Sequence, residues 1–269
     1  MTLPVSPSPS GAGSGASRRT FLRHAGLATL AWTAAAASPP VLPPKPSPEA
    51  EGAALAQDLR NQPPALNTSG TLRRRGRDGK WLDPFTVRLE ITGDEPAWQS
   101  HYHVFEPDDT WRETLRIAAG TAQPNEYHLT RVGENGGPVA VGPWRGNAAS
   151  VPLAGSDFWW CDLGLEFFHW PAQRILKTEM RKGRSCRVLE STNPDPWPGV
   201  YARVLSWIDL EHGGLLRAEA FGPDQRRMKE FNIGSFKKVD KRWQLKSMEI
   251  RQVEADTRTR LEFDLEVEA

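Results

Sequence analysis

The sequence predicts a mainly β (α+β) fold, in which one curled antiparallel sheet forms an incomplete β-barrel with an N-terminal helix and a helical lid. The first observation is the strict alternation of apolar and polar residues in FTVRLEI (85–91), which is typical of a strand with one buried face. The second is that about ten strand-like segments recur with Gly, Pro, Asn or Asp between them, as in an antiparallel meander. The third is that only two segments have helical character. Because two helices cannot form a layer over so large a sheet, we expect the sheet to curl into a half-open barrel with helices plugging its mouth.

An export signal is predicted in residues 1–37. SRRTFLR (17–23) precedes an apolar run over Ala25–Ala37 that ends in small residues, which is the order found in secretory signal peptides. The pair Arg18 and Arg19, followed by Phe-Leu, is typical of the twin-arginine pathway. The run is shorter than the roughly 20 apolar residues that a membrane-spanning helix needs. We therefore expect cleavage near the end of the run and a mature protein that is periplasmic or otherwise exported.

A proline-rich linker (38–47) leads into the folded domain, which we place at 48–269. Ser47 is a good N-cap for a first helix, and Pro48 suits the first helical position. The two prolines at 63–64 end this helix.

Strands then follow in order, interrupted by one helical insertion at about 157–169. The basic run over Leu72–Arg77 is interpreted as a solvated strand edge or turn, because such runs are rarely nucleic-acid sites in a chain of net charge +1. The strands are predicted at 85–91, 98–106, 112–119, 126–132, 184–192, 200–210, 214–221, 228–238, 243–253 and 258–267.

The aromatic stretch GSDFWWCDLGLEFFHW (155–170) is the candidate lid. Written as one helix, it places Trp160, Leu163, Phe167 and Trp170 on a single face. Two interpretations remain open: the helix is an ordinary core helix, or it is a lid whose aromatic residues line a ligand cavity. In the second case we expect Leu205 and Trp207, in the 200–210 strand, to line the same cavity.

Three segments resemble the outer-membrane lipoprotein-sorting family, the LolA-like proteins. They are PLAGSDFWWCDL (152–163), GRSCRVLEST (183–192) and VLSWIDLEHGGLLRAEAF (204–221). The resemblance implies an incomplete antiparallel barrel with a helical lid over an apolar cavity. The best-known members carry acylated lipoproteins across the periplasm and hold the lid shut with an arginine, whose counterpart the sequence does not identify.

Two further groups of residues are candidates for chemistry. Cys161 and Cys186 could form a disulfide in an oxidising compartment and so tether the lid to a strand. His101 and His103 share one face of a strand and, with His128, could begin a metal site. No motif for a zinc protease helix, a phosphate loop or a nucleophile elbow accompanies them.

The function predicted is that of a periplasmic binding or carrier protein, with no cofactor and no metal, that holds acyl chains of a lipoprotein or lipid. Its expected partners are those acyl chains and delivery proteins at the inner or outer membrane, and no nucleic acid. Two alternatives are kept. One is an envelope sensor or scaffold of the same fold that binds a protein partner. The other is a metal-dependent enzyme that uses His101 and His103.

The twin-arginine assignment predicts that replacing both Arg18 and Arg19 with Lys traps full-length precursor in the cytoplasm. The reason is that the translocase recognises the arginine pair rather than its charge alone. Fractionation and immunoblotting of both forms would measure this. Mature protein in the periplasm of a strain lacking only the twin-arginine translocase would refute the assignment.

Overall fold

The computed structural model describes residues 45–63, 67–94, 97–120, 124–239 and 242–265. The chain from Lys45 to Ala269 forms one compact unit. The predicted signal peptide with Arg18 and Arg19 lies outside the described residues, as does the linker up to residue 44. Among the helices described, none is long and apolar enough to cross a membrane.

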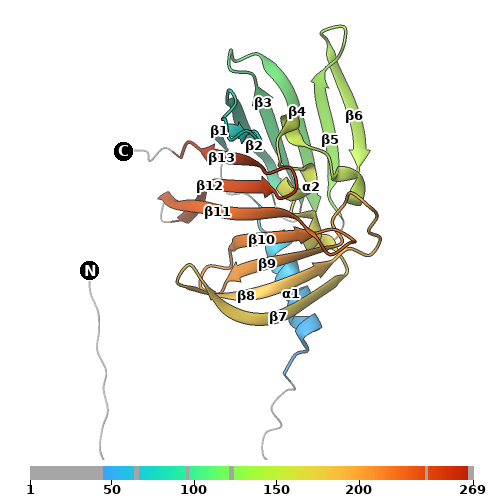
Figure 1. The fold of residues 1–269 in the computed structure, drawn as a ribbon, viewed down its shortest axis with the longest axis vertical. Helices are drawn as coiled ribbons and strands as arrows, with labels where there is room; N and C mark the ends of the chain where they lie inside the picture. The colour runs from blue at the N-terminus through green and yellow to red at the C-terminus, as the bar shows by residue number, and fades with distance from the viewer. Residues whose placement is uncertain (1–44, 64–66, 95–96, 121–123, 240–241, 266–269) are drawn as a thin grey trace, which may run out of the picture. The chain divides into compact units, whose positions relative to one another are not determined.

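Within the described residues, thirteen antiparallel strands form one sheet in the order β6-β5-β4-β3-β2-β1-β13-β12-β11-β10-β9-β8-β7 (Figure 1). The chain runs outward from β1 to β6, crosses over, and returns from β7 to β13, which pairs with β1. The edge strands β6 and β7 are at opposite ends of this order, so the sheet curls without closing, as the sequence predicts. The strands are β1 (Thr68–Arg75), β2 (Phe85–Asp94), β3 (Ala97–Phe105), β4 (Trp111–Gly120), β5 (Glu126–Val132), β6 (Pro138–Trp144), β7 (Ala172–Arg181), β8 (Arg184–Thr192), β9 (Arg203–Asp209), β10 (Leu215–Phe221), β11 (Arg227–Val239), β12 (Arg242–Gln252) and β13 (Thr257–Phe263).

Three of these strands are absent from the sequence prediction. β6 and β7 are the edges of the sheet, and most of their residues are exposed or half-buried, so they show little apolar alternation. β1 contains Leu72–Arg75 of the basic run, for which the interpretation as a solvated edge or turn is wrong, whereas Arg77 is exposed in the turn that follows β1. The strand is central, between β2 and β13, and its Leu72 is fully buried. The Arg74 guanidinium lies 4.1 Å from the centre of the Phe85 ring, which lets an arginine occupy an inward position.

The predicted lid helix at 157–169 is also corrected. The crossover contains short helical turns: η1 (Gly146–Ala149), η2 (Leu153–Gly155), α2 (Trp160–Leu163) and η3 (Glu166–His169). Leu165 has a φ of 49°, in the left-handed region, and this residue ends the helical path. The single face expected for Trp160, Leu163, Phe167 and Trp170 therefore does not exist. Residues 153–170, called the lid segment below, are nevertheless held against the sheet.

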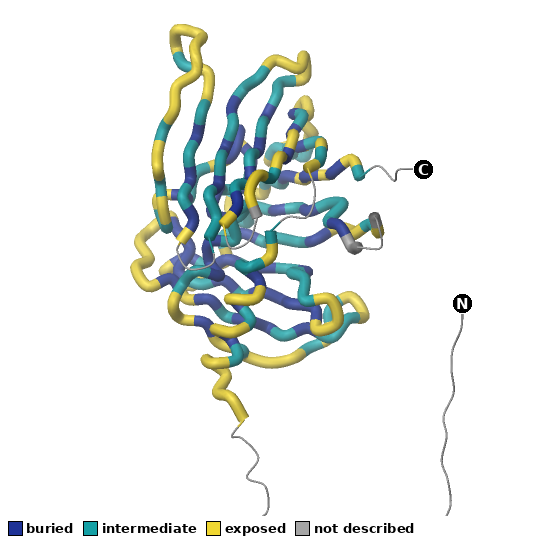
Figure 2. The backbone as a smooth tube through the Cα atoms, turned by 180° about the vertical axis from the view of Figure 1, so that it is seen from behind, coloured by how far each residue is buried: buried dark blue, intermediate teal, exposed yellow. Residues whose placement is uncertain are grey.

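The sheet has two unequal apolar faces. Buried positions alternate along most strands (Figure 2). The main core lies on the concave face, beneath the lid segment, and includes Leu115, Ile208 and Leu261 from distant strands. A smaller cluster forms on the other face, from Cys186, Val188, Trp207 and Leu216, with Leu205 packed against it. The lid segment thus covers the face that carries most of the buried apolar residues.

Helix α1 (Pro48–Arg60) packs against β7 and η3. The predicted N-cap is confirmed, because the Ser47 hydroxyl accepts a hydrogen bond of 3.2 Å from the Ala50 amide. The approach of α1 to β7 is unusually close at Gly52. A Cβ atom added there would lie 2.6 Å from the backbone nitrogen of Arg174. Glycine is therefore required at this position, since it lets α1 pack directly on the edge strand.

We expect Gly52→Ala to lower the free energy of unfolding by about 1–2 kcal/mol, although alanine is the better helix former by about 1 kcal/mol. The clash with the β7 backbone outweighs the gain in helix propensity. Ala53→Gly, at the exposed neighbouring position, is the control and measures propensity alone. Urea denaturation of the three proteins gives the comparison. A stabilised Gly52→Ala protein would mean that α1 is not seated on β7 as described.

Candidate functional site

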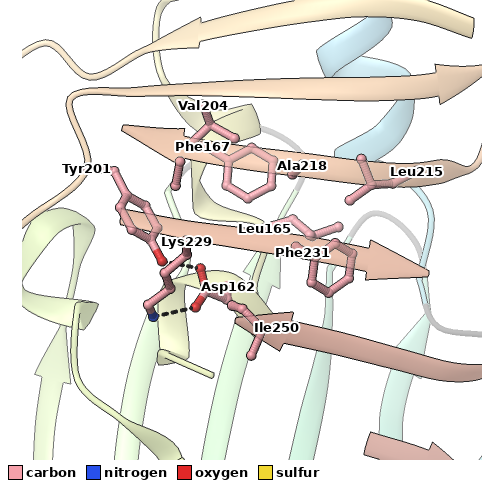
Figure 3. Close-up of a pocket in the computed structure, with 11 residues that line it drawn as sticks. Asp162, Leu165, Phe167, Tyr201, Val204, Leu215, Ala218, Lys229, Phe231 and Ile250 are labelled. Atoms are coloured by element: carbon pink, nitrogen blue, oxygen red, sulfur yellow. Dashed lines mark hydrogen bonds and ion pairs between the residues drawn. The ribbon is translucent and has the colours of Figure 1, made fainter. Parts of the chain in front are cut away.

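A small apolar hollow lies between the lid segment and strands β9–β12 (Figure 3). Its volume is about 20 Å³, room for little more than one water molecule. The side chains of Leu165 and Phe167 point from the lid segment into the space above the strands. The concave face is therefore filled by the protein's own lid. The strand residues that line the hollow are Val204, Leu215, Ala218, Ala220, Lys229, Phe231 and Ile250, with Tyr201 from the loop before β9.

The lid segment contains two residues with strained backbones. Ala154 and Leu165 both have a φ of 49°, although neither is glycine. A left-handed conformation costs an L-residue roughly 1–2 kcal/mol, so it persists only where surrounding contacts hold it. Leu165 is one of the two residues that fill the hollow. The surrounding contacts therefore keep the Leu165 side chain in the hollow although its backbone is strained.

A buried ion pair joins the lid segment to the sheet. The ammonium of Lys229, on β11, lies 3.0 Å from the Asp162 carboxylate in α2, and their side chains are 2% and 8% exposed. The other Asp162 oxygen accepts a hydrogen bond of 2.8 Å from the Tyr201 hydroxyl. Lys229 also donates to the Asp157 carbonyl at 2.7 Å and lies 3.5 Å from the centre of the Trp159 ring. Burial lowers the pKa of Lys229, and the Asp162 carboxylate opposes that shift.

Polar contacts also anchor the start of the lid segment. The Asp157 carboxylate accepts hydrogen bonds from the hydroxyls of Thr257 and Thr259, at 2.5 and 2.8 Å, on β13. The Ala154 amide donates to the buried Glu113 carboxylate on β4 at 2.7 Å. These contacts tie the first part of the lid segment to β13, in the middle of the sheet, and to β4, nearer the β6 edge.

The end of the lid segment is attached to the β5 side of the sheet. The Tyr127 hydroxyl donates to the Glu166 carboxylate at 3.0 Å, and the Asn125 amide donates to the Gly164 carbonyl at 2.7 Å. Burial raises the pKa of Glu166 to about 7, against the opposing effect of its hydrogen bonds to Tyr127 and Asn125. The carboxyl group is thus held in the lid near its point of half-ionisation at neutral pH.

The structure brings together only part of the predicted cavity set. Phe167 lines the hollow, while Trp160 is fully buried and stacks on Trp144 with ring centres 4.8 Å apart. Leu163 and Trp170 are half-buried and pack against the main core.

The expectation that Leu205 and Trp207 line the same cavity is wrong. They belong to the cluster on the other face, because they alternate along β9 with Val204 and Ile208, which face the main core.

The predicted disulfide is not formed. Cys161 and Cys186 are both free and buried. Cys161 belongs to the core beneath the lid segment, whereas Cys186 belongs to the cluster on the opposite face of the sheet. The sheet therefore separates the two thiols.

The histidines do not form a metal centre in the part of the chain that is described, where no group of three suitable ligands occurs. The rings of His101 and His103 stack 6.0 Å apart, and His103 bonds to the Thr114 hydroxyl at 2.9 Å. Arg116 is the cross-strand neighbour of both His101 and His128. A guanidinium between these two histidines opposes a shared cation.

Sequence reasoning missed the polar part of the site, namely Asp162, Tyr201 and Lys229. One signal was present. Lys229 alternates with Phe231 and Ile233 along β11 and so shares the face of two buried or half-buried apolar residues. A lysine at a strand position where the alternation predicts a buried apolar residue needs a charged partner. The sequence does not identify that partner, because Asp162 is distant in the chain.

An open, curled antiparallel sheet with a short helical lid on its concave face defines the LolA-like half-barrel class. A family model described only as an uncharacterized protein matches residues 143–268. Comparison with curated proteins finds no significant match.

Solved structures share this fold. A DUF1329 family protein from Desulfovibrio piger is 18% identical, with a TM-score of 0.64 over 81% of this chain and 92% of that one. A Vibrio parahaemolyticus domain named for outer membrane lipoprotein sorting is 19% identical, with a TM-score of 0.64 over 80% and 91%. A LolA superfamily protein from Nitrosomonas europaea is 15% identical, with a TM-score of 0.55 over 80% and 91%. The predicted resemblance is confirmed at the level of the fold: this chain is a LolA-like half-barrel.

The raised pKa of Glu166 predicts a pH-dependent stability. The unfolded carboxyl ionises near pH 4.5, and the folded one near 7, so this group's stabilising contribution is lost as the pH rises from about 4.5 to about 7. We expect Glu166→Gln to be more stable than the wild type at pH 8, by roughly 3 kcal/mol, and to lose that advantage at pH 4.5. Urea denaturation at both pH values measures the difference. A difference independent of pH would show that folding does not raise the pKa of Glu166.

Proposed function

We propose that the protein is an exported binding protein, not an enzyme, which carries an acyl chain of a lipid or lipoprotein in the hollow beneath its lid. The observation that carries the proposal is that two lid side chains, Leu165 and Phe167, fill a hollow on the concave face that is lined mostly by apolar residues. Moving these side chains away would expose a surface of small and apolar residues, including Ala218 and Ala220. An acyl chain is the simplest ligand that covers such a surface.

The energetics favour a carrier with moderate affinity. Burying an acyl chain is worth about 0.8 kcal/mol per methylene, so ten methylenes supply roughly 8 kcal/mol before ordering costs. Part of that free energy is offset by the apolar contacts that Leu165 and Phe167 lose when they leave the hollow. The strain at Leu165 reduces the net cost of lifting the lid, because its backbone relaxes when the hollow is vacated.

Two further observations support an envelope role. The twin-arginine signal that we predict in residues 1–37 would direct the mature protein out of the cytoplasm. One solved structure with the same fold is named for outer membrane lipoprotein sorting. A carrier in this compartment would receive its cargo at one membrane and deliver it at the other, through partners at the inner or outer membrane.

We expect Leu165→Gly to raise the affinity for a fluorescent fatty-acid probe by about tenfold. Glycine adopts the left-handed conformation freely, and the missing side chain leaves part of the hollow open to the probe. Leu163→Gly is the matched control, because it shortens a lid leucine outside the set that lines the hollow, and it should change the affinity much less. Fluorescence titration of the three proteins is the measurement.

Three outcomes of this titration separate the proposal from its alternatives. Probe binding by the wild type that Leu165→Gly strengthens supports a carrier. Equal effects of the two leucine variants would place the probe elsewhere. No binding by any of the three would contradict a carrier, and a polypeptide co-purified with the protein would then favour the sensor or scaffold.

A further inference from the structure

The charges in the hollow are distributed unequally between its two walls. Among the residues that line it, Lys229 is the cation and Asp162 the anion. Lys229 belongs to β11, and Tyr201 lies in the loop just before β9, so neither donor is part of the lid segment. Asp162 belongs to the lid segment. A lid that lifts takes the carboxylate away and leaves the ammonium and the phenol behind.

Lifting the lid would therefore leave a cation without its partner on an apolar surface. Lys229 would keep at most its bond to the Asp157 carbonyl, since Asp157 is anchored independently through Thr257 and Thr259. A buried charge is tolerated only when it is paired and hydrogen-bonded. An open state with a neutral ligand would leave this requirement unmet, whereas an anionic ligand would satisfy it.

The closed structure shows how an anion fits. The Asp162 carboxylate accepts from the Lys229 ammonium through one oxygen and from the Tyr201 hydroxyl through the other, at 3.0 and 2.8 Å. A carboxylate or a phosphate has the same acceptor oxygens and could take the same two donors. The Asp162 side chain is thus an internal stand-in for an anionic head group.

The apolar part of the hollow extends from this polar end. Figure 3 shows Tyr201, Lys229 and Asp162 at one side, and Leu215 and Phe231 at the other. Leu165 and Phe167 occupy the space above the strands between these groups. Their two side chains together contain about as many carbons as one medium-length acyl chain. The volume they vacate suits a single chain, with its head at Lys229 and its tail toward Leu215.

We propose that the cargo is a single-chain amphiphile with an anionic head group, carboxylate or phosphate, which replaces Asp162 on Lys229 and Tyr201 when the lid opens. The inference rests on the proposed carrier function and narrows its ligand. Asp162 then has two roles: it neutralises Lys229 in the empty protein, and it competes with the head group of the cargo.

The test uses three probes with the same tail: dodecanoate, dodecyl phosphate and dodecanol. Their affinities are measured by isothermal titration calorimetry on the mature wild type, on Asp162→Asn and on the double variant Asp162→Asn/Lys229→Met. Because the three head groups differ in hydration, the informative quantity is the ratio of anion to alcohol affinity, compared between proteins. The double variant contains no buried charge at this position, and its methionine retains most of the lysine's apolar volume.

We expect Asp162→Asn to bind the anionic probes about tenfold more tightly than the wild type, because the internal competitor is removed. In the double variant the anion-to-alcohol ratio should fall at least about tenfold below that of Asp162→Asn. If Asp162→Asn does not fold, the same fall is expected between the wild type and the double variant. A preference for dodecyl phosphate over dodecanoate would identify a phosphate head group, and the reverse a fatty acid.

An unchanged ratio in the double variant, with dodecanol still bound, would overturn the anionic head group and leave the carrier function intact. Absence of binding by all three probes to the wild type and to both variants would instead overturn the carrier function itself.

Discussion

The structure depends on one constraint: in the part of the chain that is described, the thirteen-stranded sheet has an apolar concave face and no second sheet covers it. Helix α1 packs at the β7 edge, so most of that face depends on the lid segment. The segment is short and only partly helical, yet it supplies fully buried side chains such as Phe158, Trp160 and Phe168. Its position on the sheet therefore determines whether the domain has a core or an exposed cavity.

Polar contacts decide where the segment lies. The bonds of Asp157 to Thr257 and Thr259, and of Glu166 to Tyr127, place its two ends over different parts of the sheet. The Lys229–Asp162 pair lies between them. Buried ion pairs add little net stability, because desolvation offsets their attraction, but a lone partner is strongly unfavourable. Such a pair distinguishes sharply between a seated lid and a displaced one, which is the property that the proposed carrier needs.

The fold could be predicted from local patterns where the residues lie in partly buried strands. FTVRLEI alternates because one face of β2 is buried, and Ser47-Pro48 mark a helix start whatever the tertiary structure. The same reasoning failed for β1, where an arginine occupies an inward position by stacking on Phe85. It failed again in the lid segment, where Leu165 adopts a left-handed conformation that no helical periodicity reveals.

The sequence by itself determined the half-barrel class, the place of the lid and the apolar character of the face beneath it, because alternation and turn residues specify which side of each strand is buried. Only the tertiary structure decided which buried surfaces meet. Lys229 and Asp162 are 67 residues apart, and Cys161 and Cys186 lie on opposite faces of one sheet. The physical reason is that local patterns fix a residue's exposure, whereas its partner depends on how strands distant in the chain curl around the lid.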